Sequence, residues 1–431
     1  MKNDSSLHSQ LSTFNSQLPK GYKQTEVGVI PEEWQVAQIG DLKPFVTSGS
    51  RGWASYYSDR GSLFVRITNL SRGTIYLDLE DSKFVNLPPD ASEGTRTQLQ
   101  EHDVLISITA DIGIVGYVDP RVPTPAYINQ HIALVRFDPS KTSGKFASYF
   151  LASEKPQKLF RASTDVGAKA GMSLLTVQKL QLALPSLSEQ RAIAGALSDV
   201  DALIGALDQL IAKKRDLKQA AMQHLLTGQK RLPGFHGEWE VKRLGDVAEL
   251  KNGYAFKSAT YTDSGEFKII TIANVQDGCM DNTECSKISS FPIDIQTHHK
   301  LRRGDILISM TGNVGRVCRV NEDNCLLNQR VGKLVSTGVD GGLLFFLLSQ
   351  RPFLVAMMGK AKGGAQGNLS VTDITEYQFH IPSDPSEQTA IAEVLSDMDA
   401  ELAALTQRRD KTRALKQGMM QELLTGRTRL V

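Results

Sequence analysis

The sequence has few cysteines, no long apolar run and almost no net charge, and each shortage excludes a class of protein. Four cysteines occur in 431 residues and none form a C-x-x-C pair, so neither a zinc site nor a disulfide framework is predicted. The longest apolar run, Leu343–Leu348, is far too short to span a bilayer. With 49 basic and 47 acidic residues, binding to nucleic acid through a local basic face is permitted but not required.

Motifs for the common cofactors and catalytic metals are also missing. The chain has no P-loop, no H-E-x-x-H and no strand-linked G-x-G-x-x-G. The stretch NLPP (Asn86–Pro89) faintly resembles an amino-methyltransferase motif, but no aromatic residue follows, which favours a loop. Glu266 and Lys268, with Asp246 upstream, resemble a nuclease metal site, in which carboxylates hold a cation. The first half of the chain has no charged residue in the places that match Glu266 and Lys268, which favours an exposed turn.

The N-terminus is polar, so no secretory signal is visible. The four cysteines are therefore expected to be thiols in a reducing cytoplasm, where we expect the protein to work without a membrane partner.

What the sequence does contain is a duplication of half its length. Glu189–Leu232 can be laid on Glu387–Leu430 without a gap, and 26 of the 44 paired residues are identical. Weaker matches precede both segments: His102–Gly113 with Arg303–Gly315, and Ile128–Val135 with Leu327–Val335. Each half therefore has a divergent segment followed by a near-constant one.

The near-constant segments are predicted to be long helices that carry a coiled-coil seam. Apolar residues alternate at spacings of four and three, and no proline interrupts the first segment. The seam residues are Ile193, Leu197, Val200, Ile204, Leu207, Ile211, Ile391, Leu395, Met398, Leu402 and Leu405. About 39 residues at roughly 1.5 Å each would give a rod of about 58 Å.

Both helices have start and stop signals in the sequence. Ser186 suits an N-cap, with Glu189 completing a capping box, and Pro385 suits the first turn of the second helix. Gly228 and Gly426 follow Leu-Leu-Thr and suit the C-terminal ends.

Each apolar seam needs a partner helix. Two copies of the chain could form a homodimeric coiled coil, or the two helices of one chain could pair. The equal lengths and matching seams favour pairing within the chain. An antiparallel pair would place the divergent domains at opposite ends, more than one turn of B-DNA (about 34 Å) apart.

The predicted fold is α+β, with two similar domains separated by two long helices that pair as an antiparallel coiled coil. Buried strands are expected at Leu63–Leu70 and Phe267–Val275. The expected segments are a polar tail (1–20), a first domain (21–187), a first helix arm (188–228), a second domain (229–385) and a second helix arm (386–431).

Candidate DNA contacts lie mostly in loops. Short polar side chains beside glycines would let backbone N–H groups approach a phosphate, as at Thr109, Asp111, Thr311 and Asn313. Gln130 and Gln329 could read adenine. The remaining candidates are two lysines in Gly-rich loops, three arginines of the first domain and two asparagines: Lys169, Lys362, Arg51, Arg66, Arg72, Asn69 and Asn274. The alternative is that these residues close turns or lie in solvated linkers.

Several motifs together resemble the specificity subunits of type I restriction–modification systems. They are SEQRAIAGALSDVDALI and SEQTAIAEVLSDMDAEL, the two LLTG ends, RLPGFHGEWEVKRLGDV after the central helix, and DILISMTGNVG. They span nearly the whole chain. The long polar tail, residues 1–20, departs from the family pattern.

That resemblance implies how the protein works. Each divergent domain would be a target-recognition domain that binds one half of a bipartite site in double-stranded DNA. The paired helices would set the spacer and dock two modification subunits, which bind S-adenosylmethionine and methylate adenine. Restriction subunits that use ATP and Mg²⁺ would join that complex. This chain would bind no cofactor or metal and would not be catalytic.

Two other classes of function stay open at this level. A self-sufficient fused DNA methyltransferase or nuclease would bind S-adenosylmethionine or cut DNA alone, and a structural coiled-coil scaffold would not bind DNA sequence-specifically.

Overall fold

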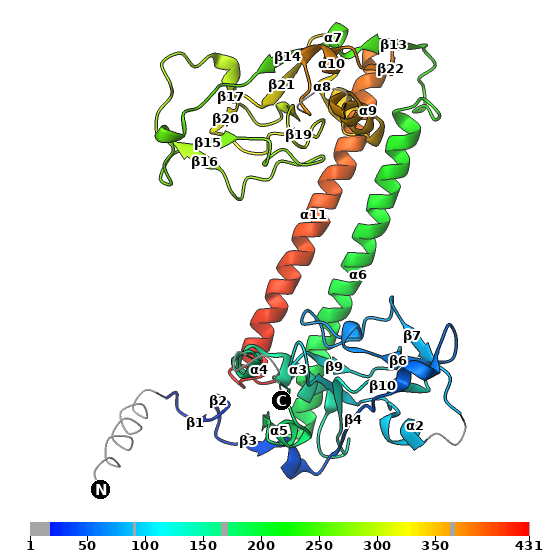
Figure 1. Cartoon of the computed structure of the whole chain (residues 1–431). Helices are drawn as coiled ribbons and strands as arrows, with labels where there is room; N and C mark the ends of the chain where they lie inside the picture. The colour runs from blue at the N-terminus through cyan, green and yellow to red at the C-terminus, as the bar shows by residue number, and fades with distance from the viewer. Residues whose placement is uncertain (1–17, 89–91, 165–170, 363–366, 431) are drawn as a thin grey trace. The chain divides into compact units, whose positions relative to one another are not determined.

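The computed structural model describes residues 18–88, 92–164, 171–362 and 367–430, and it repeats one α+β plan twice (Figure 1). The chain divides into unit 1, made of residues 1–208 and 407–431, and unit 2, made of residues 209–406. This division differs from the linear segments expected from the sequence. Each long helix contributes one part to each unit, because the two helices run antiparallel.

Unit 1 contains strands β1–β12 and helices α2–α5. The strands are β1 Tyr22–Thr25, β2 Gly28–Pro31, β3 Gln35–Gln38, β4 Phe45–Ser48, β5 Tyr57–Ser58, β6 Ser62–Val65, β7 Lys83–Val85, β8 Val104–Ser107, β9 Val115–Tyr117, β10 Ala126–Ile128, β11 Ile132–Arg136 and β12 Gln181–Leu184. The helices are α2 Ser92–Thr97, α3 Gly144–Ala152, α4 Glu154–Thr164 and α5 Leu174–Gln178.

Unit 2 contains strands β13–β22 and helices α7–α10. The strands are β13 Trp239–Arg243, β14 Ala248–Asn252, β15 Phe267–Ile270, β16 Ser286–Ile288, β17 Lys300–Leu301, β18 Ile306–Ser309, β19 Val317–Arg319, β20 Cys325–Leu327, β21 Val331–Ser336 and β22 Gln378–Pro382. The helices are α7 Leu244–Val247, α8 Gly341–Leu348, α9 Arg351–Lys362 and α10 Val371–Thr375.

The two units share their sheet topology. The order β4-β11-β8-β9 in unit 1 matches β14-β21-β18-β19 in unit 2, and all neighbours in these two sheets are antiparallel. A second four-stranded sheet in each unit contains one parallel pair, β6 with β10 and β15 with β20. The duplication in the sequence therefore extends to a repeated fold.

The ends of the long helices lie in the cores of the two units. In unit 1, Ile193 and Leu197 pack with Leu423 and Leu424 among the buried side chains of β8, β11 and α3. In unit 2, Leu225 and Leu226 pack with Ile391 and Leu395 among those of β18 and α8. Burial of this apolar surface stabilises each unit and fixes its domain to the helix pair.

No single described helix is long and apolar enough to cross a membrane, although α8 and α9 pass that test together as a bent pair. The apolar side chains of α8, Leu343–Leu348, are buried in the core of unit 2. Its hydrophobic run is thus explained by core packing.

The long helices are α6, Leu187–Leu225, and α11, Pro385–Leu423, of 39 residues each. Ser186 Oγ accepts the N–H of Glu189 at 3.2 Å, so the predicted N-cap is confirmed, and α11 begins at Pro385 as predicted. The Glu189 carboxylate does not complete a capping box, because it binds Arg429. Gly228 has φ +71° and Gly426 has φ +68°, the left-handed conformation that ends a helix.

Ion pairs within each unit show that α6 and α11 are antiparallel. In unit 1, Asp201 contacts Lys416 at 2.7 Å and Asp208 contacts Arg413 at 2.9 Å. In unit 2, the Lys214 ammonium lies 2.6 Å from Glu401, and Lys218 pairs with Asp399. In both units, residues further along α6 pair with residues that come earlier in α11, so the two helices run in opposite directions.

All eleven predicted seam residues are buried or half-buried.

Asp201 also joins the first domain to the helix pair. Tyr149 Oη of α3 donates to Asp201 Oδ2 at 2.7 Å, and burial together with this carboxylate raises the pKa of the tyrosine. The matching residue of α8 is Phe346, which has no hydroxyl, so this polar bridge is specific to unit 1.

The strands predicted at Leu63–Leu70 and Phe267–Val275 are shorter in the structure. Strand β6 ends at Val65 and β15 ends at Ile270, and a turn follows each. Each strand ends because of an asparagine that lies four residues after the last strand residue. The asparagine side chain accepts the backbone N–H of the first residue after the strand, and that N–H would otherwise extend the strand. Asn69 Oδ1 accepts the N–H of Arg66 at 2.8 Å, and Asn274 Oδ1 accepts that of Thr271 at 2.9 Å.

Candidate nucleic-acid interface

Four segments meet at one edge of each unit, beyond the end of the central strand β8 or β18. In unit 1, the N–H of Ile108 donates to the carbonyl of His131 at 2.9 Å, and that of Met172 donates to Ile108 at 2.8 Å. Ser50, in the loop after β4, forms an isolated β-bridge with Asn129. We call this convergence of loops the recognition edge of unit 1: residues 49–51, 109–113, 129–131 and 171–173.

Unit 2 builds the same edge from matching residues. The N–H of Met310 donates to the carbonyl of Arg330 at 3.0 Å, and that of Leu369 donates to Met310 at 2.8 Å. Tyr254 bridges Asn328 from the loop after β14. The recognition edge of unit 2 is therefore residues 253–256, 311–315, 328–330 and 367–370.

The asparagine of each Asn-Gln pair shapes the turn between two strands. Asn129 Oδ1 accepts the N–H of His131 at 3.1 Å, and Asn328 Oδ1 accepts that of Arg330 at 3.3 Å. Such a side-chain bond to the residue two positions on closes a tight turn. The asparagine therefore orders the turn, and the glutamine that follows it is not needed for that purpose.

The loop after each central strand is closed by a buried serine. Ser107 Oγ donates to the carbonyl of Asp111, and Ser309 Oγ donates to that of Asn313. The side chains of Asp111 and Asn313 are themselves exposed. The serines were part of the repeated pattern in the sequence, and their role is to shape this loop.

A glycine lets the first loop cross each Asn-Gln turn. A Cβ on Gly49 would lie 2.1 Å from the Asn129 carbonyl oxygen, and one on Gly253 would lie 2.0 Å from that of Asn328. We expect Gly253→Ala to lower the free energy of unfolding of unit 2 by about 1–3 kcal/mol, because backbone atoms must move apart. Gly341→Ala is the control, since its new methyl would meet open space. Urea denaturation measures both, and equal stability of the two variants would contradict this account.

The glutamine and threonine candidates lie on these edges. Thr109 Oγ1 contacts Nδ1 of His131, whose Nε2 lies 2.9 Å from the Gln130 amide nitrogen. In unit 2, Gln329 is exposed, while the hydroxyl of Thr311 is buried without a hydrogen-bond partner among the described residues.

The arginine candidates differ in their surroundings. Arg51 is exposed in the loop after β4. The Arg66 guanidinium donates to the side-chain carboxylate of Asp81 at 3.2 Å and to the backbone carbonyl of Asp81 at 2.9 Å. Arg72 contacts Asp111 and donates to the carbonyl of Ile112 at 3.0 Å, so it supports the loop after β8.

The remaining candidates lie off the edges or outside the described structure. Asn69 and Asn274 are 2% and 4% exposed, and their amides donate to the chain's own carbonyl groups. Lys169 lies outside the described residues. Lys362 is the last residue of α9, and its side chain also lies outside the described part.

Sequence reasoning missed three residues at or beside the edges. His131 and Arg330 each follow the Asn-Gln pair that was singled out, so their position in the repeat was a usable signal. Arg96 of α2 donates to Ser50 Oγ at 2.9 Å and to the Ser48 carbonyl at 2.8 Å. No local pattern indicated that contact, because Arg96 and Ser50 are 46 positions apart in the sequence.

A loop of unit 2, residues 291–299, lies against the first loop of its recognition edge. Tyr254 Oη donates to Asp294 Oδ1 at 2.7 Å, which raises the pKa of the tyrosine and lowers that of the carboxyl. His299 is buried, and its Nδ1 accepts the N–H of Gln296 at 3.0 Å.

This histidine predicts a pH effect. Burial, followed by the nearby His298, lowers the pKa of His299 from 6.5, so the unfolded chain takes up a proton at higher pH than the folded one. The stability that neutral His299 provides is present above pH 6.5 and is lost as the pH falls through the folded-state pKa. We expect His299→Gln to show a smaller loss of stability than the parent between pH 7 and pH 5. Equal losses in urea denaturation would contradict this.

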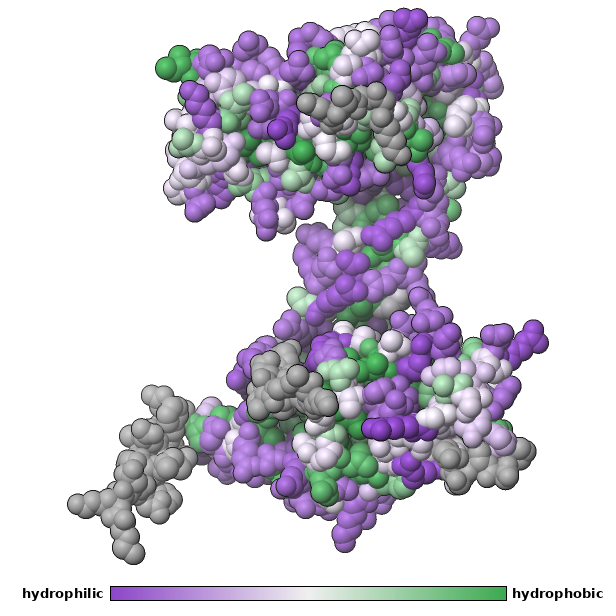
Figure 2. Space-filling view, in the orientation of Figure 1, coloured by the Kyte–Doolittle hydropathy of each residue, from purple (hydrophilic) through white to green (hydrophobic). Residues whose placement is uncertain are grey.

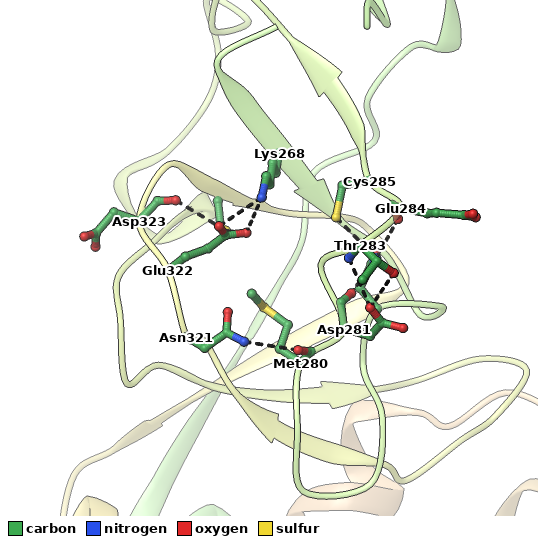
Figure 3. Close-up of polar contacts among 11 residues, drawn as sticks. Lys268, Met280, Asp281, Thr283, Glu284, Cys285, Asn321, Glu322 and Asp323 are labelled. Carbon is green, nitrogen blue, oxygen red and sulfur yellow. Dashed lines mark hydrogen bonds and ion pairs between the residues drawn. The ribbon is translucent and has the colours of Figure 1, made fainter. Parts of the chain in front are cut away.

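The residues of the nuclease-like pattern do not converge. Lys268 Nζ binds both carboxylate oxygens of Glu322 at 2.7 and 2.9 Å, which raises the pKa of the lysine (Figure 3). Glu266 accepts from Asn324 at 3.4 Å, and Asp246 accepts the N–H of Arg243 at 3.2 Å. Among the described residues, no group of three or more His, Cys, Asp or Glu side chains is placed to hold a metal ion.

Comparison with known proteins identifies the repeated unit. The family model for the type I restriction modification DNA specificity domain matches residues 31–213 and again residues 236–413. The putative type I restriction enzyme MjaX specificity subunit of Methanocaldococcus jannaschii is 26% identical, over 95% of this chain and 97% of that protein. The MjaVIII specificity subunit of the same organism is also 26% identical, over 93% and 94%.

Solved structures show the same fold. The S subunit of a type I restriction–modification system from M. genitalium has a TM-score of 0.62 at 16% identity and covers 90% of this chain and 96% of that one. A chain from a study of complex assembly in a type I system has a TM-score of 0.52 at 18% identity and covers 93% and 99%. With both copies of the domain accounting for most of its length, the chain belongs to the type I restriction–modification DNA specificity family and is the specificity subunit of such a system.

Proposed function

We propose that each unit binds one half of a bipartite site in double-stranded DNA through its recognition edge. The observation that carries this proposal is that both units form the same edge from four matching loops but expose different side chains there. A shared framework with divergent polar side chains suits two readers of different sequences. Exposed Gln329 and Arg51 and half-buried Gln130 are the base- or phosphate-binding candidates that we retain.

The paired helices α6 and α11 are proposed to set the spacer between the half-sites and to dock two modification subunits. Polar residues dominate the visible surface of the helices, with small apolar areas between them (Figure 2). In unit 2, Leu210 and Leu217 of α6 are 39% and 48% exposed, one heptad apart. Apolar side chains at this spacing on an exposed helix face suit contact with a partner helix.

The chemistry is proposed to reside on the partner subunits in the cytoplasm. The modification subunits would hold S-adenosylmethionine, and the restriction subunits would use ATP and Mg²⁺. This chain would select the site without catalysing a reaction.

Two preparations test this proposal. The purified chain alone should transfer no methyl group to DNA from S-adenosylmethionine and should not cut DNA with Mg²⁺. The complex with modification subunits should methylate one bipartite motif. Methyl transfer by the homogeneous chain alone would instead show a self-sufficient enzyme.

A further inference from the structure

The residue that follows the Asn-Gln pair occupies the same place in both units but differs in kind. It is His131 in unit 1 and Arg330 in unit 2, and in each the asparagine side chain accepts its backbone N–H. Its carbonyl accepts from the residue after β8 or β18. The backbone is therefore the same, and any difference in function at this point lies in the side chain.

In unit 1, the imidazole of His131 is hydrogen-bonded to the side chains of both Thr109 and Gln130. The Gln130 amide nitrogen can only donate, so Nε2 of His131 accepts it at 2.9 Å and the ring proton lies on Nδ1. Thr109 Oγ1 accepts that proton. The ring is thus held inside the edge, and Gln130 keeps its carbonyl oxygen and one N–H for a ligand.

In unit 2, the corresponding side chains are not tied together. Arg330 and Gln329 are exposed, and neither side chain has a hydrogen bond or ion pair with the described residues. The hydroxyl of Thr311, the counterpart of Thr109, is buried without a partner there. The Arg330 guanidinium therefore does not fold back onto its threonine, and its donors remain available.

The chemistry of each arrangement matches a different base. A guanidinium presents two parallel N–H groups, which fit O6 and N7 of guanine in the major groove. A glutamine amide presents one acceptor and one donor, which fit N6 and N7 of adenine. Histidine in place of arginine removes the guanine-reading fork from unit 1 and leaves the oriented amide of Gln130.

We propose that the residue after the Asn-Gln pair decides which base each edge reads. Arg330 contacts a guanine in the half-site of unit 2, and His131 positions Gln130 against an adenine in the half-site of unit 1. This inference rests on the proposed function and goes beyond it by naming the readers and their bases. The alternative for Arg330 is a phosphate contact, which would weaken binding to all sequences alike.

The test uses the complete complex with its modification subunits. Methylated motifs are compared for the parent, Arg330→Ala and Arg330→Lys, where lysine keeps the charge but loses the fork. Arg303→Ala is the matched control, because this exposed arginine precedes β18 at the strand end opposite the recognition edge. We expect Arg330→Ala to relax one G·C pair in one half of the motif, and Arg303→Ala to change no position.

A second measurement decides the matter even if a variant is inactive. Duplexes carrying 7-deazaguanine at single positions lack the N7 acceptor but still pair normally. At one guanine this change should weaken binding of the parent complex by about 10- to 150-fold, the range for one hydrogen bond to a charged group. The same change should have no further effect on the Arg330→Ala complex.

Three results would overturn the assignment of Arg330. They are a unit 2 half-site without a G·C pair, an unchanged motif in Arg330→Ala, or an equal loss of affinity for specific and unrelated DNA. His131→Leu should relax an A·T pair in the other half-site while thermal melting stays within a few degrees of the parent, and an unchanged motif would refute its positioning role. Absence of a bipartite motif in the parent complex would instead refute the proposed function.

Discussion

Replacing Arg231 with methionine is expected to lower the free energy of unfolding of unit 2 by about 3–5 kcal/mol. Its guanidinium binds both carboxylate oxygens of Glu387 in the first turn of α11, and it donates to the Gly237 carbonyl at 2.8 Å. Glu387 is 0% exposed. Without Arg231, the carboxylate would stay buried with no opposite charge, which is among the costliest changes in a protein interior.

Unit 1 contains the same clamp. Arg429, beyond the end of α11, binds Glu189 in the first turn of α6, with a 2.7 Å contact to Oε2. Glu189 is 1% exposed, so Arg429→Met should have an effect of similar size on unit 1. Each clamp joins the residues after one long helix to the start of the other helix.

Two controls separate charge burial from simple loss of contacts. Lys242→Met breaks a solvent-exposed pair with Glu240 and should leave the free energy of unfolding close to that of the parent. In the double variant Arg231→Met with Glu387→Leu, much of the lost stability should return, because no buried charge is left unpaired. Urea denaturation of the chain measures all three, and a loss below about 1 kcal/mol in Arg231→Met would refute the clamp.

Lengthening both long helices by four residues should widen the DNA spacer by one or two base pairs. Four residues add about 6 Å to a helix, while one base pair of B-DNA rises about 3.4 Å. They also nearly complete one turn, so the apolar seam slips by a stutter and does not rotate out of the interface. The insertions belong in Ala206–Lys213 of α6 and Ala404–Lys411 of α11, so that the arms stay equal.

The methylated motif of the insertion variant measures this effect. Both half-sites should stay unchanged while the gap between them grows. A two-residue insertion in each arm is the control, because it turns the seam by more than half a turn and should abolish methylation. An unchanged spacer in an active four-residue variant would mean that the modification subunits set the separation.

Helices were predictable from the sequence because local signals specify them. Ser186, Pro385 and the Leu-Leu-Thr-Gly ends stand within a few residues of the helix boundaries that they determine. Strand ends were harder to predict. The apolar run from Leu63 to Leu70 suggested one long strand, but capture of a backbone N–H by Asn69 ends β6 at Val65.

The division into units could not be read from a linear sequence. Because the long helices pair antiparallel, each of them contributes one half to unit 1 and the other half to unit 2. No local sequence pattern shows which half of a helix packs against which domain. The recognition edges were only partly predictable for a similar reason. The Asn-Gln pairs pointed to the right turns, yet the contact of Arg72 with Asp111 joins residues 39 apart and depends on the folded sheet.

Each unit is proposed to read its own half-site independently of the other unit. The most direct measurement is the methylated motif of a complex in which residues 237–382 have been replaced by those of another family member. One half of the motif should change completely, while the other half and the spacer stay as in the parent. A change in both halves, or in neither, would contradict this proposal.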